Sequence, residues 1–249
     1  MKKTFGNLNL KTHIFDELDS TSRYLKSEYR SHPQPAFCIA KRQTSGYGRN
    51  GRKWVSSDND ISFSVLLPFY GSVSNLFGLS ELAAISIHRA LSSTLTQVVQ
   101  LKWPNDLYAQ DKKIAGILIE VLHTSEGLSW LVIGVGLNLS VKPRFEDYEA
   151  GYLTSDDPFG LVESMVYQLE NLSETFTPDM WVKNKSYWDR YDMFKIGDLV
   201  KIKSDRGVFD AYYRGVSDQG ELLVTLISNG QANEDVTCFI SAEISLRAK

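Results

Sequence analysis

Two apolar segments decide the fold of this sequence. The first reads Lys112-Lys113-Ile114-Ala115-Gly116-Ile117-Leu118-Ile119-Glu120-Val121-Leu122, and the second reads Trp130-Leu131-Val132-Ile133-Gly134-Val135-Gly136-Leu137-Asn138-Leu139. Both are rich in aliphatic residues and partly β-branched, which is typical of buried strands. Residues 98–103 have the same texture, and Pro104-Asn105-Asp106 after them is turn chemistry. The three segments predict consecutive strands of one sheet.

Helical and extended patterns continue on both sides of these strands. Strands are expected at 12–15, 36–41 and 61–67, the last of them closed by Pro68. Capping residues in Asp19-Ser20-Thr21-Ser22 predict a short helix that carries Tyr24, Leu25 and Tyr29 on one face. Longer helices are predicted at 75–95, from Pro158 onward and at 178–187.

The texture of the sequence changes after Tyr191. Short strands are expected at 194–200, 207–213, 222–227 and 236–240, separated by glycine-containing turns, and a last strand is expected at 241–247. This pattern predicts a small β-barrel. We therefore expect an α+β fold with two domains, residues 1–190 and residues 191–249. The first should hold a mixed sheet with helices on one side.

Composition excludes several classes of protein. The chain has 249 residues with 43% hydrophobic residues and a net charge of −3, so it should bury a core, and it has no overall basic footprint for nucleic acid. No apolar run reaches membrane-spanning length, and the first residues do not form a signal peptide. Cys38 and Cys238 are far apart and lie in apolar segments, which favours buried free thiols in a reducing cytoplasm.

A glycine-rich loop is the first candidate for a ligand site. Gly46, Gly48 and Gly51 allow a backbone that approaches a ligand closely, and Arg49 and Arg52 add cations that pair with phosphate or carboxylate. Such a string is weak evidence alone, and a flexible surface loop is the other interpretation. Trp54 favours the ligand site, because a bulky aromatic residue at the end of a loop can clamp a ligand as the loop closes.

Lys113 and Asn138 are candidates because of their places on strands. Lys113 enters a buried strand from a turn, so its ammonium can point into a pocket where an anion binds, although a solvated hairpin explains it equally well. Lys112 fits a surface residue better. Gly116 marks a close approach to the backbone. Asn138 can present a donor and an acceptor to an adenine or ribose, or can bind neighbouring backbone. The four histidines are not spaced in the sequence as a pair of metal ligands would be.

Five motifs occur together in a specific order. They are Asp19-Ser20-Thr21, Arg42-Gln43-Thr44, Gly46-Tyr47-Gly48-Arg49-Asn50-Gly51-Arg52-Lys53-Trp54, Lys102-Trp103-Pro104-Asn105-Asp106 with Lys113-Ile114-Ala115-Gly116, and Gly134-Val135-Gly136-Leu137-Asn138. In this order the chain resembles bacterial biotin–protein ligases over nearly its whole length. The resemblance implies a class II synthetase-like catalytic domain followed by an SH3-like barrel.

The resemblance also implies roles for matching positions. Ser20, Thr21 and Gln43 would meet the ureido ring of biotin. Gly46, Tyr47, Gly48 and Gly116 would line the biotin site, with Lys113 and Arg49 as the catalytic cations. Residues expected at the nucleotide are Arg49, Arg52, Trp54, Asn138 and Arg247. Asp106 is a weak candidate for a metal ligand.

The chain departs from the family pattern at Tyr47, and also at Ser22, where asparagine is frequent, and at Ala242, where glycine is frequent. The last two do not affect the assignment. Tyr47 replaces the first arginine of the usual Gly-Arg-Gly-Arg loop, so its side chain should stack or form a hydrogen bond. The ligase motifs begin at Asp19, too early to leave room for a helix-turn-helix domain that many relatives carry. A ligase without DNA-binding activity is therefore expected.

The resemblance implies ATP and biotin as substrates, Mg²⁺ as a cofactor and biotinyl-5'-AMP as an intermediate. The partner would be a biotin carboxyl carrier protein in the cytoplasm, with the ligase a monomer or a homodimer. Two alternatives remain at this point: a lipoate–protein ligase, which shares the chemistry, and a non-catalytic sensor of biotin or nucleotide. A DNA-binding regulator would show a DNA affinity that falls steeply with salt, and the net negative charge of the chain does not favour such binding.

Overall fold

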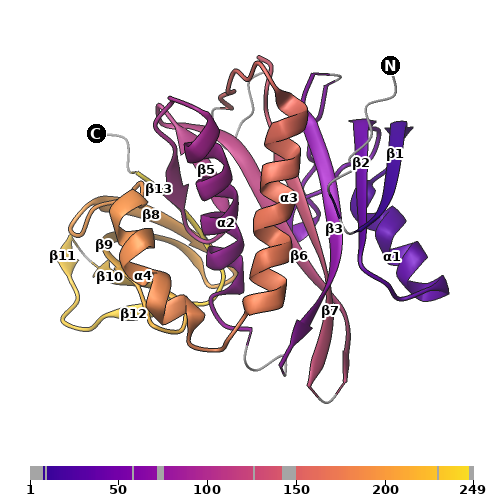
Figure 1. The fold of residues 1–249 in the computed structure, drawn as a ribbon. Coiled ribbons are helices and arrows are strands. Elements are labelled where there is room, and N and C mark those ends of the chain that lie inside the picture. The colour runs from indigo at the N-terminus through magenta and orange to yellow at the C-terminus, as the bar shows by residue number, and fades with distance from the viewer. Residues whose placement is uncertain are drawn as a thin grey trace.

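Two β-sheets organise the computed structural model, which describes residues 8, 10–57, 59–71, 76–125, 127–141, 150–228 and 230–246. The larger sheet has seven strands in the order β1-β2-β3-β7-β6-β5-β4 (Figure 1). Only β1 and β2 pair in parallel, so the sheet is mixed, as predicted. Its strands are β1 (Lys11–Leu18), β2 (Ala36–Gln43), β3 (Ile61–Tyr70), β4 (Gln100–Lys102), β5 (Asp106–Ala109), β6 (Lys112–Ser125) and β7 (Leu128–Leu137).

The predicted end of β3 at Pro68 is wrong. The strand runs through Pro68 to Tyr70 and stays paired with β7, where Pro68 lies opposite Trp130. Its pairing with β2 stops at Leu66, so beyond that point one side of β3 is an open edge. A proline is tolerated at such an edge because its missing N–H removes no hydrogen bond from the ladder.

Helices cover both faces of the large sheet, which corrects the prediction of helices on one side. Helix α1 (Thr21–Ser31) buries Leu25 against Leu66 and Val132. The alternate residues of the same strands, such as Val65 and Ile133, face α2 (Leu79–Thr94) and α3 (Pro158–Thr175) in the main core. Because side chains alternate along a strand, the two clusters lie on opposite faces (Figure 1).

The predicted helix boundaries are confirmed in part. α3 begins at Pro158, with Asp157 as its N-cap accepting a hydrogen bond from the Gly160 amide at 3.1 Å. α2 begins at Leu79 and not at Asn75, after Gly78 with a φ of 72°. Asn75 itself lies outside the described residues. None of the described helices is long and apolar enough to cross a membrane.

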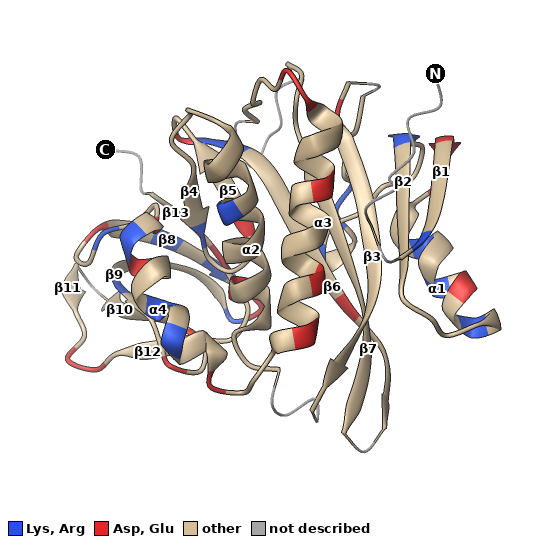
Figure 2. Cartoon of the chain, viewed as in Figure 1, with Lys and Arg blue, Asp and Glu red and all other residues tan. Residues whose placement is uncertain are grey.

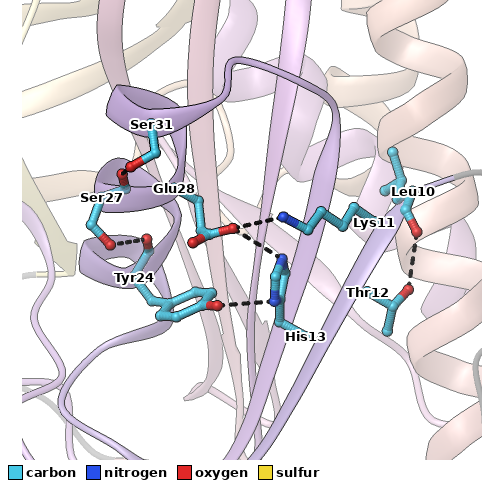
Figure 3. A network of polar contacts seen from close by, with 8 residues as sticks. All are labelled: Leu10, Lys11, Thr12, His13, Tyr24, Ser27, Glu28 and Ser31. Atoms are coloured by element: carbon cyan, nitrogen blue, oxygen red, sulfur yellow. Dashed lines mark hydrogen bonds and ion pairs between the residues drawn. The ribbon is translucent and has the colours of Figure 1, made fainter.

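A polar network fastens the edge strand β1 to α1 (Figure 3). Glu28 accepts a hydrogen bond from Lys11 at 2.9 Å and lies 3.6 Å from the His13 Nε2 atom. Tyr24 Oη lies 2.9 Å from His13 Nδ1. Burial lowers the pKa of His13, against the attraction of Glu28. This network joins Tyr24 and Glu28 of α1 to β1 and so fixes the helix against the edge of the sheet.

The smaller sheet forms the C-terminal unit. Its strands run in the order β11-β10-β9-β8-β13, and β12 pairs with β10. All of these pairings are antiparallel. Helix α4 (Met180–Tyr191) leads into it, and its strands are β8 (Leu199–Ser204), β9 (Gly207–Val216), β10 (Leu222–Ser228), β11 (Gln231–Ala232), β12 (Thr237–Phe239) and β13 (Glu243–Leu246). The expected domain boundary after residue 190 falls at the last turn of α4 and stays a prediction.

Two sequence expectations fail in the C-terminal unit. The strand expected from Phe194 begins only at Leu199, because the Asp192 and Asp198 side chains accept hydrogen bonds from the Phe194 and Lys195 amides and hold a turn there. Cys238 is exposed on β12, whereas Cys38 is buried as predicted.

Tryptophan side chains join the two units. Trp103 and Trp181 donate from Nε1 to the carbonyl oxygens of Gly220 and Ser217, each at 2.9 Å. The turn between β9 and β10 is thereby docked on the large domain, and one continuous apolar core runs through both units.

Candidate functional site

A cleft of about 420 Å³ lies between the α1 face of the large sheet, the glycine-rich loop and the C-terminal sheet. Strand register explains its floor. Lys102, Asp106, Gly116, Gly136 and Ser62 lie side by side in one row across five strands. The next row contains Leu118, Gly134 and Ser64. Three glycines on two neighbouring strands thus leave the middle of the sheet without side chains on this face.

The floor glycines cannot be replaced without movement of their neighbours. A methyl group on Gly134 would lie 2.8 Å from the Ser22 hydroxyl. On Gly136 it would lie 2.2 Å from the indole ring of Trp54. The sequence motif that contains Gly134 and Gly136 did not reveal that these glycines face the cleft, although their two-residue spacing is a signal for one bare face of a strand.

One end of the cleft is lined with small polar groups. Gln43 Oε1 accepts from the Thr21 amide at 2.9 Å and from its hydroxyl at 3.2 Å. Ser64 Oγ lies 2.8 Å from the Thr21 hydroxyl and 2.9 Å from that of Ser22. Ser20 is the N-cap of α1 and also lines the cleft. The structure brings together the predicted Ser20, Thr21 and Gln43 and adds Ser64, which the sequence did not reveal.

The glycine-rich loop forms a short hairpin over the cleft. The Gly48 amide donates to the Arg52 carbonyl at 2.7 Å, and the Trp54 amide donates to the Gly46 carbonyl at 2.9 Å. A 3-10 turn, Arg49–Gly51, closes the hairpin. The Trp54 ring lies on the floor, where a methyl group on Gly116 would come within 3.4 Å of it. The loop therefore covers the cleft with its backbone and one aromatic ring.

Tyr47 points from this hairpin toward α1 and β6. Its hydroxyl donates to Glu120 at 2.8 Å. The Arg23 guanidinium lies 5.0 Å and the Lys26 ammonium 5.4 Å from the centre of its ring. Burial raises the pKa of Tyr47, so the hydroxyl stays protonated and remains a donor. The expected stacking or hydrogen bonding of this residue thus has defined partners.

Cations gather at the other end of the cleft. The Lys113 ammonium lies 2.7 Å from Asp106 and 5.9 Å from the centre of the Trp54 ring. Arg49 donates to Ser241 at 2.7 Å and to Asn105 at 3.5 Å. Desolvation by burial lowers the pKa of Arg49, although the charges of Asp106, Glu81 and Glu243 act in the opposite direction. Lys112, in contrast, is exposed, as expected.

Two more basic residues complete this end. Arg52 forms an ion pair with Glu243 of the C-terminal sheet. Lys102 donates to the Tyr108 hydroxyl at 2.9 Å, and burial lowers its pKa to about 8. Lys102 belongs to one of the five sequence motifs, but the motif alone predicts no role for it.

The remaining predicted residues lie elsewhere. Asn138 donates to the backbone carbonyls of Gly151 and Lys113 at 3.1 and 3.3 Å, and it is absent from the cleft lining. Its contact with adenine stays a prediction. Arg247 lies outside the described residues. Within the described ranges, no three His, Cys, Asp or Glu side chains form a metal-binding group.

The geometry defines a class of protein. A glycine-floored cleft with hydrogen-bonding groups at one end and lysine and arginine side chains at the other suits a small apolar acid next to a nucleotide phosphate. Enzymes that activate a carboxylate with a nucleotide need these two adjoining environments.

Comparison with known proteins assigns the family. Residues 14–138 match the model of the biotin/lipoate A/B protein ligase family. The chain is 30% identical over 244 residues to the bifunctional ligase/repressor BirA of Escherichia coli, covering 94% of this chain and 74% of BirA. It is 32% identical over 118 residues to the biotin–[acetyl-CoA-carboxylase] ligase of Paracoccus denitrificans, covering 47% of this chain and 49% of that protein.

A solved structure has the same fold. The biotin protein ligase of Aquifex aeolicus, in complex with biotin and ATP, superimposes with a TM-score of 0.72 at 26% identity. The match covers 96% of this chain and 99% of that one. The chain belongs to the biotin/lipoate A/B protein ligase family.

Proposed function

We propose that the chain is a biotin–protein ligase, which makes biotinyl-5'-AMP from biotin and ATP and transfers the biotinyl group to a lysine of a biotin carboxyl carrier protein. The observation that carries this proposal is the polarity of the cleft. Its hydrogen-bonding end, at Thr21 and Gln43, suits the ureido ring, and its cationic end, at Lys113 and Arg49, suits the carboxylate and phosphate. The strip of floor at Gly134 and Gly136, bordered by the Trp54 ring above Gly136, would take the apolar chain between the two ends.

The reaction has two steps. In the first, a carboxylate oxygen of biotin attacks the α-phosphorus of ATP, and the bond to pyrophosphate breaks. Negative charge grows on the phosphate oxygens, and Lys113 and Arg49 are the cations that stabilise it. Lys113 is available because Asp106 holds its ammonium in the cleft until an anion binds.

In the second step, the neutral amine of the carrier lysine attacks the activated carbonyl carbon, and AMP leaves. The mixed anhydride reacts with water, so the cover formed by the hairpin and Trp54 is needed to protect it. We assign Gly46, Gly48 and Gly116 to this covered region, and Arg52, Trp54, Asn138 and Arg247 to the nucleotide.

Mg²⁺ is proposed as an ion that enters with ATP. Magnesium is usually held by one or two carboxylates together with substrate phosphates, and it neutralises their charge. Asp106 fits one such contact, because its carboxylate lines the cleft beside Lys113. The reaction is expected in the cytoplasm, by a monomer or a homodimer, with the carrier protein and not DNA as the partner.

The test compares two acids. Purified chain is incubated with ATP, an apo carrier domain and either radiolabelled biotin or radiolabelled lipoate. Biotin should be incorporated into the carrier, and lipoate should be incorporated at least about a hundredfold more slowly, because Thr21 and Gln43 would lack the ureido partner. Equal or faster incorporation of lipoate would make the chain a lipoate ligase, and no ATP consumption with either acid would indicate a sensor.

A further inference from the structure

The hairpin that covers the cleft is anchored by side chains on two sides. On one side, Arg49 and Arg52 contact Ser241 and Glu243 of the C-terminal sheet. On the other side, Tyr47 contacts Glu120 of β6. Three glycines and an exposed tip contribute little apolar burial, so these contacts determine how long the hairpin stays closed.

The Tyr47 anchor is a network and not a single bond. Glu120 accepts from both Tyr47 and Lys26, so one carboxylate joins the hairpin, β6 and α1. Burial opposes the charge of Lys26, yet hydrogen bonds and attraction from Glu120 and Tyr47 raise its pKa overall. The lysine therefore stays charged beside Glu120, and its ammonium and the Arg23 guanidinium also face the Tyr47 ring.

The two sides differ in what a ligand does to them. Arg49 lies at the cationic end, so an arriving phosphate competes with Ser241 and Asn105 for its guanidinium. An anion would likewise compete with Glu243 for the Arg52 guanidinium. Tyr47 lines the cleft, but its hydroxyl is bonded to Glu120, and neither Glu120 nor Lys26 belongs to the lining, so a ligand in the cleft does not compete for this bond.

We propose that Tyr47 is a positioning residue whose bond to Glu120 favours the closed hairpin both without a ligand and with the acyl-adenylate bound, so that the adenylate is retained until the carrier arrives. The closing role is a property of the chain without ligand. Only the retention role rests on the proposed function. Tyrosine at this position suits the network, because its neutral ring accepts two neighbouring cations that an arginine would repel.

Trypsin provides the first test, since it cleaves after Arg49, Arg52 and Lys53 in the hairpin. Ligand-free chain is digested briefly, and the loop fragments are quantified by mass spectrometry. Tyr47→Phe and Glu120→Ala should each be cut in the hairpin about fivefold faster than wild type, and the double variant no faster than either. Tyr187→Phe is the matched control, because it removes a tyrosine hydroxyl that lies 2.8 Å from His88 Nδ1, between α4 and α2 and outside the cleft lining.

Thermal unfolding of each variant shows whether faster cleavage comes from opening of the hairpin or from a less stable fold. If Tyr47→Phe lowers the stability of the whole chain, the cleavage rate of Glu120→Ala is used to test the anchor. The second measurement is AMP release with biotin and ATP but no carrier, which should rise about fivefold in both variants as adenylate escapes into water. Hairpin cleavage at the wild-type rate in both variants, or unchanged AMP release, overturns the proposal. Wild-type chain that makes no biotin-dependent AMP even when the apo carrier is present refutes the proposed function instead and leaves the proteolysis result standing.

Discussion

At the scale of single residues, charge compensation governs the site. Lys113 and Asp106 are both mostly buried, with side chains 17% and 21% exposed, and they form an ion pair with 2.7 Å between the ammonium nitrogen and a carboxylate oxygen. A phosphate entering the cleft would offer Lys113 a second anion. The ion pair therefore keeps the Lys113 ammonium at the reacting end of the cleft, where Asp106 balances its charge before an anion binds.

This arrangement predicts a kinetic effect. Lys113→Ala should slow biotin-dependent exchange of pyrophosphate into ATP by about a hundredfold, since loss of one group that stabilises a transition-state charge costs on the order of 3 kcal/mol. Lys112→Ala is the matched control, because Lys112 is exposed on the same strand. Exchange by Lys113→Ala within a few-fold of wild type would remove this lysine from the mechanism.

The sequence carried part of this residue-level information. It identified Lys113, Arg49, Thr21 and Gln43 as residues of one site, and they do line one cleft. It could not choose between the two interpretations of Lys113, because the direction of the side chain depends on a register shift between Leu107 and Tyr108. For Asn138 it could not foresee that backbone carbonyls of Gly151 and Lys113 lie within reach of the amide.

At the scale of elements, two strands make the binding surface by omitting side chains. Gly116 of β6 and Gly136 of β7 are register partners, and Gly134 lies one repeat further along. Strand interiors normally avoid glycine because it packs poorly and loses more entropy on folding. Here the cost is offset by space for a ligand and for the Trp54 ring.

A single methyl group tests this reading of the floor. In Gly136→Ala the new Cβ would lie 2.2 Å from the Trp54 ring, so the ring must move and this strip of floor is narrowed. Biotin affinity by calorimetric titration should fall at least about tenfold, because a small misfit in a well-packed pocket costs about 1–3 kcal/mol. Thermal unfolding should show the fold intact. Unchanged affinity would mean that the acyl chain does not cross the floor at this strand.

The pattern of neighbouring residues predicted most helices and strands. It failed where contacts between distant segments of the chain determine the structure. The strands and helices were found because their periodicity is strong. The helices were expected on one side of the sheet, because pattern alone does not show that Leu25 of α1 meets Leu66 and Val132 on the other face. The strand expected at Phe194 was lost to hydrogen bonds from Asp192 and Asp198, which compete with a ladder.

At the scale of the whole molecule, charge is distributed unevenly although the net charge is only −3. Helix α3 carries Glu163, Glu170 and Glu174 and no lysine or arginine (Figure 2). The cationic residues of the cleft lie on the opposite face of the large sheet from this helix. An anionic substrate is therefore attracted to the cleft side and repelled from the α3 side.

The two units meet at a buried joint. Trp103 belongs to the turn that carries Asn105 and Asp106, and its indole holds Gly220 of the C-terminal unit. A methyl group on Gly220 would lie 3.1 Å from Gly78 and 3.3 Å from Glu81 Oε2, so the backbones are in close contact there. The position of the C-terminal sheet over the cleft thus depends on the joint beneath it.

Glu81 makes this joint sensitive to pH. Burial raises the pKa of Glu81 to about 8, above the ordinary value of 4.5, against the opposing effects of a backbone hydrogen bond, Arg49 and Trp103. In the folded chain the carboxyl is therefore protonated at neutral pH, whereas in the unfolded chain it is ionised. Its contribution to stability is complete below pH 4.5 and is lost as the pH rises to about 8.

Removing this carboxyl should flatten the pH dependence of stability. The free energy of unfolding of the wild type should fall relative to Glu81→Gln by up to about 1.4 kcal/mol per pH unit between the two pKa values. In melting temperature this is a few degrees per pH unit for a chain of this size. Thermal unfolding between pH 5 and 9 measures it, with Glu174→Gln on the exposed side of α3 as a control for the change in net charge. Parallel curves for wild type and Glu81→Gln would show that the carboxyl is already ionised in the joint, and the C-terminal sheet would then be held there by Trp103 and Trp181 without a titrating partner.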